Sequence, residues 1–103
     1  MSRISNTPAF FAAQKNVTTS GTPVALAANT IPDGAKLVVK AKSGNTGTIT
    51  VGNSSTNALN TGTTSVRLAQ NQSVELQVNN SELVWIDATV SGEGVEYFSE
   101  AHA

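Results

Sequence analysis

The chain contains no cysteine and only one histidine, His102, and these scarcities exclude several kinds of site. Without cysteine there is no disulfide and no thiolate metal site, and one imidazole cannot build a multi-histidine metal centre. We therefore expect no cofactor. His102 lies next to the last residue, where a chain frays, so we expect a solvated side chain rather than the rigidly held base of a catalytic triad.

Charged and aromatic residues are also scarce. Charged residues are 13% of the 103 residues, and the net charge of −1 gives no basic field for nucleic acid. Aromatic residues are 5%, so the core of so small a domain is thin, and oligomerisation is the expected source of extra stability. No run approaches the ~20 apolar residues of a membrane helix, and no signal peptide is recognisable, so we expect synthesis in the cytoplasm and no membrane contact.

The main pattern in the chain is an alternation of apolar and polar residues, which is clearest from Lys36 to Asn53. Strands are predicted over residues 36–42 and 46–51, because every second residue in each is apolar. The Gly-Asn-Thr-Gly sequence between them is typical of a tight turn. The whole segment is therefore predicted to be a β-hairpin.

Short alternating segments separated by turn signals recur in the rest of the chain. Further strands are predicted over residues 16–19, 23–27, 66–68, 73–79, 83–90 and 95–99. Turn signals at 31–34 and 91–94 and a long loop over 53–64 separate them. Seven or eight short strands without any helical period predict an all-β protein, an antiparallel β-sandwich or jelly-roll-like domain over residues 16–103. Residues 1–15 show no clean period and are predicted to be an N-terminal arm, with Phe10 and Phe11 reaching across an interface.

No set of residues resembles a catalytic site, so we expect that the protein is not an enzyme. Asp87 with Glu75, Glu93 or Glu96 supplies the only carboxylate pairs worth testing against a glycosidase mechanism. One interpretation is that Asp87 is a carboxylate buried among the apolar residues of its strand. The other interpretation is that Asp87 meets a lysine, a threonine hydroxyl or a turn amide at a subunit contact. The glycine-rich turns lack the following helix that a phosphate-binding loop requires.

Two groups of side chains are candidates for an interface. Leu83 and Trp85 share one side of their predicted strand, and a loop or the arm of the same subunit, a neighbouring subunit or a sugar ring would cover them. Lys40 and Lys42 project from one strand face together with Lys36. They form either a solvated face opposite Glu75 or an electrostatic contact with an acidic partner.

The order of these segments resembles a known family. VTTSGTPVAL begins at Val17, KLVVKAKSGNTGTITVGNSS begins at Lys36, and VRLAQNQSVELQVNNSELVWIDATVSGEGVEYFS begins at Val66. The pattern is similar to small virion proteins of tailed bacteriophages, over Val17 to Ser99. One departure is Asn71, at a position that often holds glycine in the family; asparagine also tolerates a positive φ, so the turn is expected to survive.

The resemblance implies a structural virion protein, above all a head decoration protein on the outer capsid surface. Its implied partners are the major capsid protein and two further copies of itself in a homotrimer, and its implied role is to stabilise the phage head. A tail, neck or fibre accessory module is one alternative. A carbohydrate-binding adhesion module is another, in which the loop over 53–64 would contact a host-surface glycan.

Overall fold

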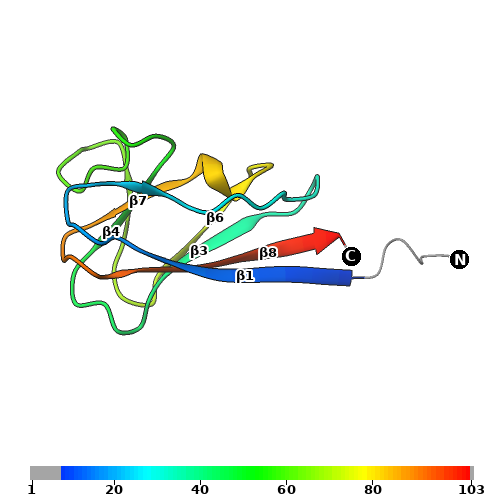
Figure 1. The fold of residues 1–103 in the computed structure, drawn as a ribbon, viewed down its shortest axis with the longest axis horizontal. Coiled ribbons are helices and arrows are strands. Elements are labelled where there is room, and N and C mark those ends of the chain that lie inside the picture. Colours follow the sequence, from blue (N-terminus) through cyan, green and yellow to red (C-terminus); the bar gives the residue numbers. More distant parts are fainter. Residues whose placement is uncertain (1–7, 103) are drawn as a thin grey trace, which may run out of the picture.

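The computed structural model describes residues 8–102 and contains eight strands and almost no helix (Figure 1). The elements of these described residues are, in chain order, β1 (Pro8–Asn16), β2 (Val24–Ala25), β3 (Leu37–Ala41), β4 (Ile49–Gly52), β5 (Val66–Leu68), β6 (Ser73–Leu76), the short 3-10 helix η2 (Ser81–Leu83), β7 (Trp85–Ala88) and β8 (Gly94–His102). Within residues 8–102 no helix is long and apolar enough to cross a membrane. The predicted all-β class and the predicted number of strands are confirmed.

The strands form two antiparallel sheets of four strands each. The first sheet has the order β1-β8-β3-β6 and the second has the order β2-β7-β4-β5. Buried apolar residues from both sheets belong to one cluster, so the two sheets share a core. On β3 the predicted alternation is confirmed, since Leu37, Val39 and Ala41 are fully buried while Val38 and Lys40 lie on the other face.

The predicted hairpin over 36–53 is wrong, although both of its strands exist. β3 pairs with β6 and β8, whereas β4 pairs with β5 and β7, so the two strands belong to different sheets. The buried residues of β3 and β4 face one core from opposite sides, and the connection between them must therefore cross the core's end instead of reversing within a sheet. Buried Asn45 in this connection donates from Nδ2 to the Gly94 carbonyl at 2.9 Å. The turn over 91–94 likewise joins two sheets, because β7 and β8 do not pair.

The N-terminal segment also differs from its prediction as an arm. Residues 8–15 lie in β1, which pairs with β8 from Pro8↔His102 to Asn16↔Gly94 (Figure 1). Phe11 and Ala13 pack against the core, while Phe10 and Ala12 point to the outer face. Because both faces carry apolar residues, the period of two is hidden in the sequence. The strand predicted over 16–19 is not formed, and residues 1–7 of the predicted arm lie outside the described residues.

Candidate interaction surface

The outer face of the β2-β7-β4-β5 sheet is covered by residues 53–65, here called the covering loop. Gly52 permits the close approach, since a Cβ there would lie 2.6 Å from the backbone nitrogen of Ala58. Ala58 is fully buried, and its carbonyl accepts a hydrogen bond from Thr50 Oγ1 at 2.5 Å. The long loop predicted over 53–64 is thus present, and Ala58 packs it on the sheet.

Asp87 holds the covering loop on β7. Its Oδ2 accepts a hydrogen bond from the backbone N–H of Asn60 at 2.8 Å, and its Oδ1 accepts from the backbone N–H of Gly21 at 3.0 Å. The side chain is fully buried. The carboxylate therefore joins two loops of the same chain to one strand. The turn amides expected for Asp87 are present, and they come from its own chain.

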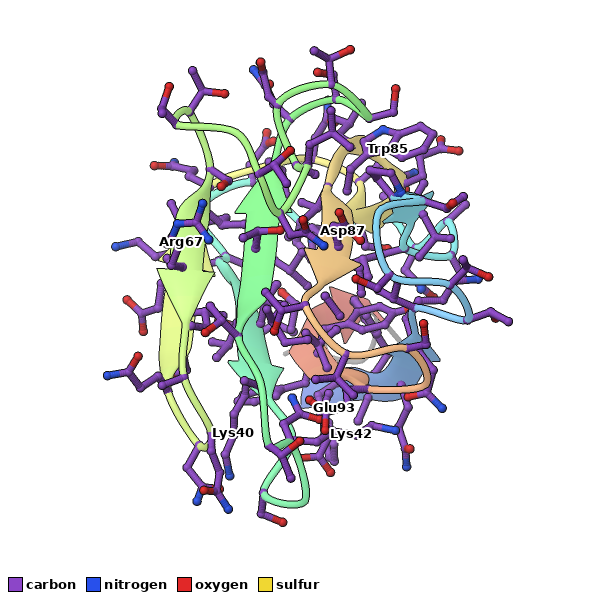
Figure 2. The ribbon with its side chains drawn as sticks, turned by 90° about the vertical axis from the view of Figure 1, so that its left-hand side faces the viewer. Lys40, Lys42, Arg67, Trp85, Asp87 and Glu93 are labelled. Atoms are coloured by element: carbon purple, nitrogen blue, oxygen red, sulfur yellow. The ribbon has the colours of Figure 1, made fainter. Side chains whose placement is uncertain are left out.

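Arg67 holds the same loop from the other side of β4 (Figure 2). Its Nη2 donates to the carbonyl oxygens of Asn60 and Gly62 at 3.0 and 2.8 Å. Asn60 also donates from Nδ2 to the Ala88 carbonyl at 2.7 Å. Since Asn60 is bonded through its N–H, its carbonyl and its side chain, this part of the covering loop is an internal support and its polar groups are already used.

Glu93 fixes the connection between β3 and β4 near Lys42, at the end of the domain opposite Trp85 (Figure 2). Its carboxylate accepts hydrogen bonds from the backbone N–H groups of Thr46 and Gly47 at 2.7 and 2.9 Å, and from Thr46 Oγ1. The amide of Thr46, followed by that of Gly47, lowers the pKa of Glu93 below its ordinary 4.5. The Glu93 carboxylate is thus a structural hydrogen-bond acceptor. Its hydrogen bonds and its lowered pKa do not suit a general acid.

Leu83 and Trp85, the first pair of predicted interface residues, are separated by the structure. Leu83 ends the helix η2, is 50% exposed, and borders an apolar hollow of about 290 Å³ together with Val66 and Val78. Trp85 is half-buried and lies in register with Gly52, directly beside the residues of the covering loop that cross that glycine. Three covers were considered for Trp85: a loop or the arm of the same subunit, a neighbouring subunit, or a sugar ring. The first is present, because a loop of the same subunit covers part of the Trp85 side chain.

The outer face of the β1-β8-β3-β6 sheet has no such cover among the described residues. Phe98 on β8 is 43% exposed and lies in register between Ala12 of β1 and Val38 of β3. Phe10, on the same face of β1, is 74% exposed. An open hollow of about 700 Å³ lies between Phe10, Phe98 and Val38. We call these four residues, Phe10, Ala12, Val38 and Phe98, the apolar row.

Charged residues flank the apolar row in two columns of opposite sign. Lys36 and Lys40 lie on the β3 side, and Lys36 Nζ is 4.0 Å from the carboxylate of Glu75 on the neighbouring strand β6. Glu96 and Glu100 lie on β8, where Glu96 is in register with Lys40. The predicted contact of the lysine face with Glu75 is present. Since the pair is exposed, it contributes little to stability by itself.

Lys42 belongs to this face but is directed toward β1. Its Nζ donates to Gln14 Oε1 at 2.7 Å and to Asn16 Oδ1 at 2.8 Å. The reach across β8 is open because Gly94, which is in register with Asn16, has no side chain there. Of the predicted interface residues, Phe10 and Lys40 thus share this open face, and Lys42 lies at its end.

Phe11 and Tyr97 lie on the buried side of the same two strands. Their rings meet edge to face, with centroids 6.3 Å apart. Tyr97 is 1% exposed, and its hydroxyl accepts a hydrogen bond from the Ala27 N–H at 3.2 Å. Phe11 therefore contributes to the core, and Tyr97 offers no surface for stacking on a sugar.

Sequence reasoning missed Phe98, the central residue of the open face. The signal was present, because Val95 and Tyr97 alternate with Glu96 and Phe98, and a buried Tyr97 requires Phe98 to point outward. The expectation for Asn71 is confirmed, since its φ is 68° and the following N–H closes a turn onto the Ala69 carbonyl.

Neither sheet offers an evident chemical centre in the part of the chain that the structure describes. Between residues 8 and 102, no three side chains of the histidine, cysteine, aspartate or glutamate type lie close enough to hold a metal ion. The open face of the first sheet, with Phe10 and Phe98 exposed, is the strongest candidate for an interaction surface among the described residues. No protein-family model matches the chain, and neither a curated protein nor a solved structure matches it.

Proposed function

We propose that the chain is a structural protein of a tailed-phage virion, which binds the outside of the capsid through the open face of its β1-β8-β3-β6 sheet. The observation that carries the proposal is the exposed apolar row on that face. Large apolar side chains gathered on one face of a small domain are typical of a contact surface. Aromatic residues with charged residues around them are the usual anatomy of such a surface, in which the aromatics supply most of the affinity.

The fold supports the same proposal at a coarser level. The chain passes from one sheet to the other at every connection except that between β4 and β5. We propose that the resulting orders, β1-β8-β3-β6 and β2-β7-β4-β5, make the domain a jelly roll, an eight-stranded arrangement found in viral capsid domains and in lectins. Fold alone does not assign a function, so the proposal depends on the face and on the resemblance over residues 17–99.

The mechanism would be stabilisation by mass action. A protein that binds the assembled shell and not its separate subunits lowers the free energy of the shell. The two charged columns would set the orientation of the module on its partner, because opposite charges must be aligned across the contact. The apolar row would supply the affinity.

Co-sedimentation with empty capsid shells of the phage that encodes the chain tests the proposal. We expect saturable binding, and Phe98→Ser should weaken it by at least about tenfold, since burial of a phenylalanine contributes about 1.5–3 kcal/mol. Val90→Ser is the matched control, because Val90 is 40% exposed but lies in the turn between β7 and β8, away from the face. Absence of shell binding, or binding to tails alone, would contradict the proposal.

A further inference from the structure

The four sheet edges of this domain are unequal. β2, β5 and β6 are edge strands of two, three and four residues, and β5 and β6 carry the charged residues Arg67 and Glu75. Short length and charge are the usual means by which proteins prevent their sheet edges from pairing with other chains. The fourth edge strand, β1, has nine residues and no charged residue before Lys15.

The outer edge of β1 has backbone groups available for pairing. Within residues 8–102, β8 is the strand that pairs with β1, and it does so along one side over all nine residues. In an antiparallel strand the N–H and C=O groups of alternate residues point to opposite sides, so about half of those in β1 point away from β8. These groups form a template for one further extended strand.

We infer that a second copy of this chain supplies that strand, with β1 pairing antiparallel to β1 across a two-fold axis. The register follows from the faces. Phe10, Ala12 and Gln14 lie on the outer face, and pairing that keeps both faces continuous must place an outer residue opposite an outer residue. Pairing over the full length of β1 then centres the axis on Ala12. The two sheets join into one sheet of eight strands.

Charge favours this antiparallel partner. Lys15 is the one charged residue in β1, and the two-fold axis at Ala12 places it opposite Ala9 of the other copy. The two Lys15 residues then lie six positions apart along the strands, about 20 Å, where salt screens their repulsion. A partner strand in the parallel direction would instead bring the two lysines side by side.

The apolar row also continues across the axis. Phe98 is in register with Ala12, so the pairing produces the sequence Phe98, Ala12, Ala12, Phe98 from one copy to the other. Neighbouring apolar residues on adjacent strands stabilise a sheet by direct contact. The second copy thus satisfies both the backbone edge and the side chains beside it, which is the property of an isologous interface.

The test is the solution mass of the purified full-length chain, measured by light scattering from micromolar to millimolar concentration. We expect a concentration-dependent mass that approaches about 21 kDa, twice the 10.6 kDa of one chain. Ala12→Lys and Ala12→Glu should each give monomers, because like charges would face each other at the axis. A mixture of the two variants should recover the dimer, since opposite charges would then meet.

Val66→Lys is the control, because it adds the same charge to a 45% exposed position on the edge of the other sheet. This variant should dimerise like the parent chain. Recovery in the mixture also shows that the Ala12 variants are folded. A parent chain that stays at 10.6 kDa at every concentration, a trimer of three chains, or a mixture that stays monomeric would each overturn the inference. Because the measurement uses the chain alone, its failure leaves the capsid proposal to its own test.

Discussion

Removal of the Asp87 carboxylate should be among the most damaging single changes on the outer side of the second sheet. In Asp87→Ala, the backbone N–H groups of Gly21 and Asn60 lose the acceptors that lie 3.0 and 2.8 Å away. A hydrogen bond to a charged group contributes about 1.5–3 kcal/mol, so two such bonds give a loss of about 3–6 kcal/mol in the free energy of unfolding. Small domains have only about 5–15 kcal/mol in total.

Asp87→Asn separates the role of charge from that of shape. Asparagine keeps one oxygen, but its amide group must point a donor at one of the two backbone N–H groups, so we expect about half of the loss seen with alanine. Urea unfolding at neutral pH measures both variants. With a slope of about 1–3 kcal/mol per molar urea, the midpoint for Asp87→Ala should fall by at least about 1 M.

The matched control is Asp33→Ala, which removes an exposed carboxylate from a turn and should change stability by less than about 0.5 kcal/mol. Hydrogen exchange adds a second measurement, because the Asn60 amide should lose protection in both Asp87 variants. If Asp87→Ala and Asp33→Ala unfold at the same urea concentration, then Asp87 does not hold the covering loop on the sheet and the reasoning fails.

Three further changes have expected outcomes. Gly94→Ala places a Cβ 2.0 Å from the Lys15 carbonyl, so it should lower the free energy of unfolding by about 1–3 kcal/mol in a thermal melt, and an unchanged melting temperature would contradict this. The lowered pKa of Glu93 contributes stability that is present above its ordinary 4.5 and is lost as pH falls below it. Acid titration of Glu93→Gln should therefore show a smaller drop than the parent, and parallel curves would exclude this contribution. Tyr97→Phe leaves the Ala27 N–H without its acceptor and should cost about 1 kcal/mol in urea unfolding, whereas a loss near zero would mean that water replaces the hydroxyl.

The sequence predicts the strands of this protein better than it predicts their partners. Leu37, Val39 and Ala41 alternate with polar residues, and their side chains are buried as expected, because burial on one face of a strand is a local property. Which sheet a strand joins depends on residues far away in the chain. The turn after β3 has the composition of a hairpin, yet its geometry is set by Glu93 and Gly94, about fifty residues later.

The candidate surface was also predicted only in part, because the residues that it gathers come from segments far apart in the chain. Phe10 and Lys40 were identified from their own segments, and the structure places both on the open face. Phe98 was missed because residues 95–99 were predicted only as a strand, without assigning each residue to the core face or the outer face. Phe11 was assigned to an interface as part of the predicted N-terminal arm, but a residue between two outward neighbours in a strand must face the core.

The pairing of β1 with β8 has a consequence for synthesis of the chain on the ribosome. β1 leaves the ribosome first, but its partner in the described chain extends to His102. β3 also has no strand to pair with when it is synthesised, because its neighbours β6 and β8 are both made later. Translation adds about 5–20 residues per second, so β1 has no place in a sheet for several seconds. During that interval its edge, which has no charged residue before Lys15, is open to any extended strand nearby. Expression at lower temperature or with a chaperone should therefore raise the soluble yield.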